Sequence, residues 1–280
     1  MTHPAFNADA VAVITGGASG IGLAAAKRFA AYGMAVGLVD LGADKLSAAA
    51  AEVASAGARE VLTSETDVSD IDALRALEAE VTEKLGGATI LMNNAGIQFG
   101  SSLFSPNADW RKLMDVNLWG PINGTQVFGP GMLDRNRPGL IINTGSKQGI
   151  TTPPGDPAYN VSKSGLKTFT EALEHDLRNR PNTNLTAHLL IPGFVFTSLT
   201  RGDRTEKPAG AWTPDQTADF MFESLERGDF YILCPDNEVT RDLDEKRMAW
   251  AMGDLIENRP PLSRWPQAWA GPFEHFFRGR

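Results

Sequence analysis

The sequence of 280 residues is poor in the side chains that build disulfides and metal sites. It has 1 cysteine, Cys234, which excludes an intrachain disulfide and fits a reducing compartment. Its 4 histidines are scattered along the chain and lack the spacing of metal ligands. We therefore expect no bound metal ion.

Long apolar runs and an excess of positive charge are also missing. No apolar stretch reaches the roughly 20 residues that a membrane-spanning helix needs, and the first residues lack the basic and apolar regions of a secretory signal. The 26 lysines and arginines are outnumbered by 34 aspartates and glutamates, so the net charge is −8. This balance argues against nucleic acid or an anionic membrane as a partner. We expect a cytoplasmic protein whose partner is a small molecule.

Short apolar runs alternate with longer stretches of helical periodicity. The expected strands are residues 10–15, 35–40, 60–65, 89–94, 140–145, 185–191 and 230–234. The expected helices are residues 22–32, 43–56, 71–85, 110–133, 158–178 and 215–227. This alternation predicts an α/β fold with a parallel sheet, and strands that are apolar on both sides predict helices on both faces.

The end of the chain differs from the body. A charged amphipathic helix is expected near residues 238–256, and a segment rich in proline and aromatic residues follows it. Disordered tails are seldom so aromatic, so we expect this end to pack on the body or on a neighbouring subunit. The predicted organisation is one domain, residues 1–235, with a C-terminal extension, residues 236–280.

A glycine-rich turn, TGGASGIG at residues 15–22, lies between the first expected strand and the first helix. A turn that faces a pyrophosphate needs glycines for close backbone approach, and the helix then offers its free N–H groups. Asp40 ends the second strand, where a carboxylate accepts hydrogen bonds from ribose hydroxyls and repels a 2′-phosphate. No lysine or arginine lies in the turn or directly after Asp40, which favours NAD over NADP. The alternative is that Asp40 is a helix N-cap.

With this turn, the motifs NNAG (93–96), YNVSK (159–163) and PGFVFT (192–197) resemble those of the classical short-chain dehydrogenase/reductase family. The similarity runs from about residue 8 to about residue 235. The resemblance implies a Rossmann-type, doubly wound fold with a seven-stranded parallel sheet, a nicotinamide cofactor, and a homodimer or homotetramer. Residues 1–235 would then be the dinucleotide-binding catalytic domain.

The resemblance also implies which residues bind the cofactor. The matching residues are Gly16, Ser19, Gly20, Ile21, Gly22, Asp40, Asp67, Val68, Asn94, Ala95, Gly96, Tyr159, Lys163, Pro192, Gly193, Val195 and Thr197. Asn93 is expected to brace neighbouring strands instead.

Tyr159 and Lys163 are four residues apart, so on a helix they share one face. A free tyrosine has a pKa of about 10, and a nearby cation favours the phenolate. We expect Lys163 and the positive charge of the nicotinamide to lower the pKa of Tyr159, which suits proton exchange with an alcohol. Such a pair also occurs by chance in many helices.

Two further polar residues complete the expected catalytic set. Ser146 ends the fifth expected strand and can donate a hydrogen bond to a substrate oxygen. Asn117 matches the asparagine that serves a water-linked proton relay in the family. With Asn117, Ser146, Tyr159 and Lys163, the predicted reaction is hydride transfer between NAD(H) and a secondary alcohol or ketone. The alternatives are a cofactor-sensing regulator or scaffold on the same fold, and an epimerase or dehydratase.

The substrate is expected to contact Gln98, Gln148 and Phe194, and the aromatic character of the neighbouring segment suggests an apolar or ring-containing molecule. Lys147 directly follows Ser146 and could meet a substrate carboxylate or phosphate. We prefer the interpretation that it points to solvent.

Overall fold

The central feature of the computed structural model, which describes residues 2–104 and 106–278, is a sheet of seven parallel strands. The strand order is β3-β2-β1-β4-β5-β6-β7. The strands are β1 (Val11–Thr15), β2 (Ala35–Asp40), β3 (Glu60–Glu65), β4 (Ile90–Asn93), β5 (Gly139–Thr144), β6 (Leu185–Ile191) and β7 (Tyr231–Leu233). Each strand lies within one residue of the predicted run, so the predicted sheet is confirmed.

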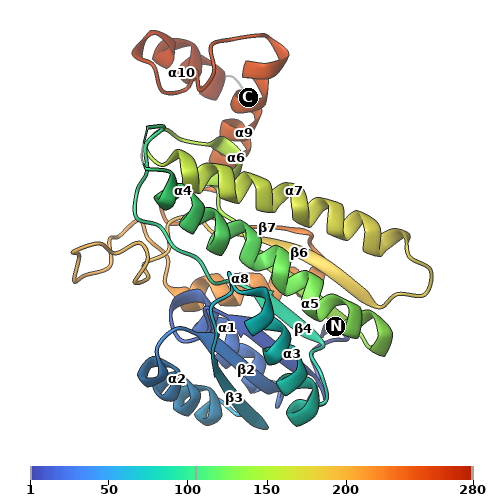
Figure 1. Ribbon diagram of the computed structural model, residues 1–280. Coiled ribbons are helices and arrows are strands. Elements are labelled where there is room, and N and C mark those ends of the chain that lie inside the picture. Colours follow the sequence, from blue (N-terminus) through green and yellow to red (C-terminus); the bar gives the residue numbers. More distant parts are fainter. Residues whose placement is uncertain (1, 105, 279–280) are drawn as a thin grey trace.

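Helices cover both faces of this sheet (Figure 1). One face packs against α1 (Gly20–Ala31), α2 (Ala43–Ser55) and α8 (Pro214–Arg227). The other packs against α3 (Ile71–Leu85), α5 (Gly120–Arg135) and α7 (Pro157–Asn179). The strand residues alternate accordingly: Ile14 belongs to the core with Phe29 of α1, and Val13 to the core with Phe128 of α5. The fold is therefore the predicted doubly wound one.

The strand order reverses between β1 and β4, which are neighbours in the sheet although β2 and β3 follow β1 in the chain. In open parallel sheets, ligands bind beyond the carboxyl ends of the strands at such a point. The glycine turn follows β1, and the NNAG segment follows β4. The topology therefore brings two of the sequence motifs to the same edge of the sheet.

The helix predicted at residues 110–133 consists of three parts. It begins as α4 (Asn107–Met114), continues through a π turn, η1 (Asp115–Trp119), and ends as α5. A π turn inserts one extra residue per turn and often occurs at functional sites. The helical periodicity of the sequence does not reveal it.

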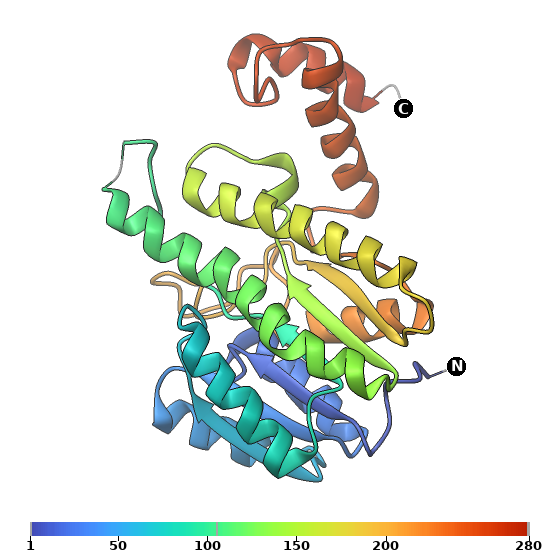
Figure 2. The ribbon, with the colours of Figure 1, turned by 45° about the vertical axis from the view of Figure 1, so that its right-hand side comes forward.

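The C-terminal tail, which we define as residues 236–278, extends away from the body of the protein (Figures 1 and 2). Helix α9 (Arg241–Ile256) contacts the short helix α6 (Gln148–Thr151), and α10 (Ala270–Arg278) packs on α9 after a 3-10 turn, η2 (Gln267–Trp269). Trp250 is 3% exposed and forms the centre of the tail, where its ring meets those of Trp269, Phe273 and Phe276. The tail therefore has a small core of its own and joins the body at α6.

In the part of the chain that the structure describes, no helix is long and apolar enough to cross a membrane. The same residues contain no group of three or more histidine, cysteine, aspartate or glutamate side chains that could hold a metal ion.

Candidate active site

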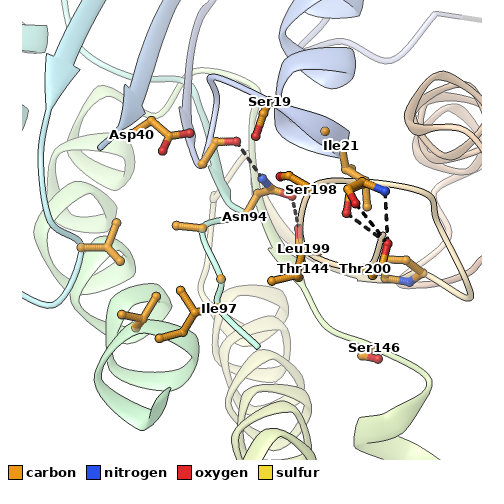
Figure 3. Close-up of a pocket in the computed structure, with 18 of the residues that line it drawn as sticks. Ser19, Ile21, Asp40, Asn94, Ile97, Thr144, Ser146, Ser198, Leu199 and Thr200 are labelled. Atoms are coloured by element: carbon orange, nitrogen blue, oxygen red, sulfur yellow. Dashed lines mark hydrogen bonds between the residues drawn. The ribbon is translucent and has the colours of Figure 1, made fainter. Parts of the chain in front are cut away.

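A cleft of about 460 Å³ lies beyond the carboxyl ends of the strands (Figure 3). Its lining includes Ser146, Tyr159 and Lys163 and every residue predicted to bind the cofactor except Gly22. The lining also includes residues that no motif marked, which are Val39, Leu41, Lys45, Thr66, Ile97, Lys112, Val116, Thr144, Gly145, Ser198, Leu199 and Thr200. Folding thus gathers segments that are up to about 180 residues apart in the sequence.

The glycine turn is shaped so that only glycine fits at its key positions. Gly16 and Gly20 have φ angles of +64° and +55°, in the left-handed region that other residues rarely adopt. A Cβ atom on Gly22 would lie 2.2 Å from the carbonyl oxygen of Gly16, so Gly22 stands behind the turn rather than on the cleft. Helix α1 begins at Gly20, and no side chain caps its first N–H groups. These free donors and the open backbone fit a pyrophosphate.

Asp40 faces the same cleft from the end of β2. Its carboxylate accepts hydrogen bonds from the backbone N–H groups of Ala18 (3.0 Å) and Leu41 (2.8 Å), which fix its position. Helix α2 has Gly42 as its N-cap, so the alternative that Asp40 caps this helix is wrong. Lys45 of α2, which follows Asp40 by five residues, also lines the cleft, although no motif singled it out.

Asn94 connects the glycine turn to the centre of the sheet (Figure 3). Its side-chain N–H₂ group donates to the carbonyl oxygens of Thr15 and Gly16, both at 3.2 Å, and its oxygen accepts from the Thr144 hydroxyl at 3.3 Å. The neighbouring Asn93 is buried and donates to Asn143 of β5 at 2.8 Å. Asn93 therefore braces adjacent strands, as expected.

Asn117 lies in the π turn and is completely buried. Its oxygen accepts from the N–H of Ile97, and its N–H₂ group donates to the carbonyl of Ile97, both at 2.8 Å. Asn117 therefore does not line the cleft, but it fixes the backbone that leaves β4 for the cleft wall. Only the family resemblance had singled it out.

Tyr159 and Lys163 lie one turn apart on α7, and both are buried. The ammonium of Lys163 donates to the carbonyl of Thr144 at 2.8 Å and lies 5.7 Å from the centroid of the Tyr159 ring. Ser146 accepts a hydrogen bond from the N–H of Gln148 at 3.1 Å. Its hydroxyl also interacts with that of Tyr159. A serine hydroxyl, a phenol and an ammonium therefore meet in one water-poor site.

Burial is the main cause of the pKa shifts of Tyr159 and Lys163. Loss of water raises the pKa of Tyr159 to about 12, although its interaction with Ser146 lowers it, and the charge of Asp156 raises it further. Burial lowers the pKa of Lys163 to about 8. The net shift in the pKa of Tyr159 is therefore upward in the chain by itself, opposite to the expected lowering, because burial dominates and Lys163 is not among its causes.

A Lys163→Met variant is expected to differ from the wild type in the pH dependence of its stability. The pKa of Lys163 is about 8 in the folded protein against an ordinary value of 10.5, so the unfolded chain binds more protons between these values. The free energy of unfolding of the wild type should therefore rise relative to that of the variant as the pH increases through this window. Urea unfolding of both proteins below, within and above the window measures this change.

Lys167→Met is the matched control, because Lys167 lies on the same helix and pairs with Glu171 on its exposed side. The difference in free energy of unfolding between this variant and the wild type should not change in the same way across that pH window. If the Lys163→Met difference stayed constant with pH, the buried ammonium would carry no such penalty.

The three predicted substrate residues do not line the cleft in the described structure. Gln98 donates to the carboxylate of Asp156 at 3.2 Å, Gln148 begins α6, and the ring of Phe194 lies 5.9 Å from the guanidinium carbon of Arg204. Gln98 follows Ile97 and Phe194 lies between Gly193 and Val195, all of which line the cleft, and the N–H of Gln148 donates to Ser146. These three positions are therefore adjacent to the cleft rather than on it.

Lys147 does not point to solvent, so the preferred interpretation of this residue is wrong. Its ammonium lies 2.6 Å from Asp244 of α9 and 3.6 Å from Asp236, and its side chain is 16% exposed. Asp236 also accepts a hydrogen bond from the N–H of Phe194 at 3.3 Å. These contacts join the segment after β5, the loop after β6 and the tail. Because Lys147 and its two partners are about 90 residues apart or more, the sequence alone did not reveal the contacts.

Comparison with known proteins agrees with this geometry. Residues 10–208 match the family model described as short chain dehydrogenase. The chain is 31% identical over 261 residues to 1-deoxy-11-beta-hydroxypentalenate dehydrogenase of Streptomyces exfoliatus. The aligned region covers 91% of this chain and 94% of that protein.

Two solved structures resemble this protein over most of its length. A short-chain dehydrogenase/reductase from Burkholderia phymatum in complex with NAD is 32% identical, with a TM-score of 0.82 over 92% of this chain and 97% of that one. An alcohol dehydrogenase from Thermococcus sibiricus complexed with 5-hydroxy-NADP is 26% identical, with a TM-score of 0.69 over 77% of this chain and 90% of that one. On the family match, the relatives and the shared fold, the chain belongs to the short-chain dehydrogenase family.

Proposed function

We propose that this protein is an NAD(H)-dependent oxidoreductase that interconverts a secondary alcohol and a ketone, with Tyr159 as the general acid/base. The observation that carries the proposal is the meeting of Ser146, Tyr159 and Lys163 at one end of a cleft whose other end is the glycine turn and Asp40. A hydroxyl donor, a phenol and a buried cation at that place suit proton transfer to or from a substrate oxygen.

In this mechanism the chain's own residues bind, orient and move a proton. The Ser146 hydroxyl donates to the substrate oxygen, and the Tyr159 phenol gives or takes the proton of that oxygen. Lys163, fixed on the carbonyl of Thr144, holds positive charge beside the phenol and binds the cofactor ribose. The nicotinamide, when bound, exchanges the hydride and in its oxidised form adds a positive charge that favours the phenolate. Asn117 supports the proton relay by fixing Ile97.

The class of substrate follows from the cleft and from the relatives. Ile97, Val116 and Leu199 supply apolar side chains to the same cleft as the Ser146 and Tyr159 hydroxyls, which suits an apolar or ring-containing molecule. The Streptomyces relative is named as a dehydrogenase of a hydroxylated compound, which agrees with an alcohol as the substrate. We further propose residues 1–235 as the catalytic domain and residues 236–280 as an extension of it.

NADH is expected to bind more tightly than NADPH in a fluorescence titration of the two cofactors. The fixed carboxylate of Asp40 can accept from ribose hydroxyls and repels a 2′-phosphate, whereas Lys45 on the same cleft would attract one. In an Asp40→Ser variant the preference for NADH should fall by about tenfold or more, equivalent to ~1.4 kcal/mol.

Asp44→Asn, which removes an exposed carboxylate from the first turn of α2, is the matched control and should keep the wild-type preference. Tighter binding of NADPH by the wild type would show that the attraction of Lys45 for the 2′-phosphate outweighs the repulsion by Asp40. Binding of neither cofactor would overturn the enzyme proposal. Cofactor binding without any turnover would favour the regulator or scaffold, and conversion of a substrate without net change in NADH would favour an epimerase or dehydratase.

A further inference from the structure

A second cleft, of about 570 Å³, lies between α6 and the C-terminal tail. Residues 150–152 form its wall on the body, and α9 with the segment that follows it forms the wall on the tail. Figures 1 and 2 show how α9 rises from the body beside α6. No residue that lines this cleft also lines the cofactor cleft, so the two are separate.

Much of this second cleft is apolar. Trp250, Met252, Leu255, Leu262 and Trp265 all line it. All of these except Trp250 are exposed, and Leu255 is 78% exposed. Contiguous apolar surface of this kind on a folded protein marks a place where another molecule binds.

Two guanidinium groups, those of Arg247 and Arg264, line the same cleft. Neither forms an ion pair with any residue of the described chain, and the buried Nε of Arg247 has no hydrogen-bond acceptor. The carboxylates nearby are already engaged: Asp244 lies 2.6 Å from the Lys147 ammonium, and Asp254 lies 3.0 Å from Arg259. The two guanidinium groups of the cleft therefore share the charge of one carboxylate, that of Asp244, which already forms an ion pair with Lys147.

The two arginines are close enough to affect each other. Burial, and then the charge of Arg247, lower the pKa of Arg264 to about 10, although Asp244 raises it. Arg264 is held in place by two rings, with its guanidinium carbon 4.6 Å from the centroid of Trp265 and 5.5 Å from that of Phe273. An anion beside both guanidinium groups would remove this repulsion, and their planar donors match a carboxylate.

We propose that the cleft between α6 and the tail binds an organic anion that has an apolar body and one carboxylate. The carboxylate pairs with Arg247 and Arg264, and the apolar body lies against Trp250, Leu255 and Trp265. The proposal does not depend on the oxidoreductase activity. Because α6 begins two residues after Ser146, a ligand that bridges α6 and α9 would also stabilise the segment that carries Ser146.

Octanoate is the probe, titrated calorimetrically into the full-length protein. Arg247→Gln and Arg264→Gln should each weaken its binding by about tenfold or more, because each removes a charge-assisted hydrogen bond to the carboxylate. Arg241→Gln is the matched control, since Arg241 lies on the same helix but is exposed and pairs with Glu245, and it should leave the affinity unchanged. The neutral 1-octanol and inorganic phosphate should both bind more weakly than octanoate. Thermal melts establish that each variant is folded.

Several results would overturn the proposal. Equal binding of octanoate and 1-octanol would remove the role of the carboxylate, and equal binding of inorganic phosphate would remove that of the apolar body. An octanoate affinity that both arginine variants leave unchanged would remove the role of the two guanidinium groups. Loss of octanoate binding in the presence of NADH would place the probe in the cofactor cleft. Light scattering gives a further test: a molecular mass that falls in both arginine variants without octanoate would assign the cleft to a second copy of the chain.

Discussion

A Tyr159→Phe variant is expected to lose turnover by a factor of about 10²–10⁴, the usual contribution of general acid/base catalysis, while its affinity for NADH stays within a few-fold of the wild type. The change removes the phenolic hydroxyl and leaves the ring, which is buried beside Leu113 and Ala158. The site therefore keeps its shape and loses its proton donor. Initial rates with a secondary alcohol that the wild type oxidises, together with an NADH titration, measure both quantities.

Tyr231→Phe is the matched control, because Tyr231 is exposed on β7 and its hydroxyl donates to Glu171 on the surface. Its turnover should equal that of the wild type. If Tyr159→Phe kept full turnover, another group would be the acid/base and the mechanism above would fail. If it lost NADH binding as well, the hydroxyl would act in cofactor binding rather than in proton transfer.

A Gly22→Ala variant is expected to weaken NADH binding by about 100-fold, the scale of effect that a displacement of about 1 Å can have on a positioned group. The new Cβ would lie 2.2 Å from the carbonyl oxygen of Gly16 and 2.6 Å from the side-chain nitrogen of Asn94. Gly16 belongs to the turn that faces the cleft, and Asn94 holds that turn by hydrogen bonds, so the turn must move away from the start of α1. The free N–H groups of that helix would then no longer meet the pyrophosphate.

Gly129→Ala is the control for this substitution. Gly129 lies inside α5 with helical φ, and an added Cβ there would meet no atom within 4 Å. Gly129 precedes Pro130, which disfavours helical backbone in a residue that carries a Cβ, so this variant should be somewhat less stable than the wild type. Because Gly129 does not line the cofactor cleft, the variant should bind NADH as tightly as the wild type. Wild-type affinity in Gly22→Ala would show that the turn tolerates the displacement, and that the glycine serves helix packing alone.

Local patterns predicted the sheet and one end of the cleft. A short apolar run flanked by turn residues identifies a buried strand, which is why each strand was placed within one residue. The glycines of residues 15–22 could be interpreted because backbone approach and positive φ restrict the residue type at single positions. The i, i+4 spacing placed Tyr159 and Lys163 on one helical face in the same way. Each of these properties depends on neighbours in the chain.

Tertiary structure decided what depends on contacts between distant segments. The pairing of Lys147 with Asp244 and the contact of Asn117 with Ile97 each join residues that are too far apart in the sequence for a helical or strand pattern to relate them. The upward shift in the pKa of Tyr159 has the same origin, since burial by the surrounding elements sets its direction and a neighbour on the helix does not. The local sequence determined the strands, the glycine turn and the helical spacing of Tyr159 and Lys163, whereas packing determined the pKa shifts of these two residues and joined the C-terminal tail to the segment that carries Ser146.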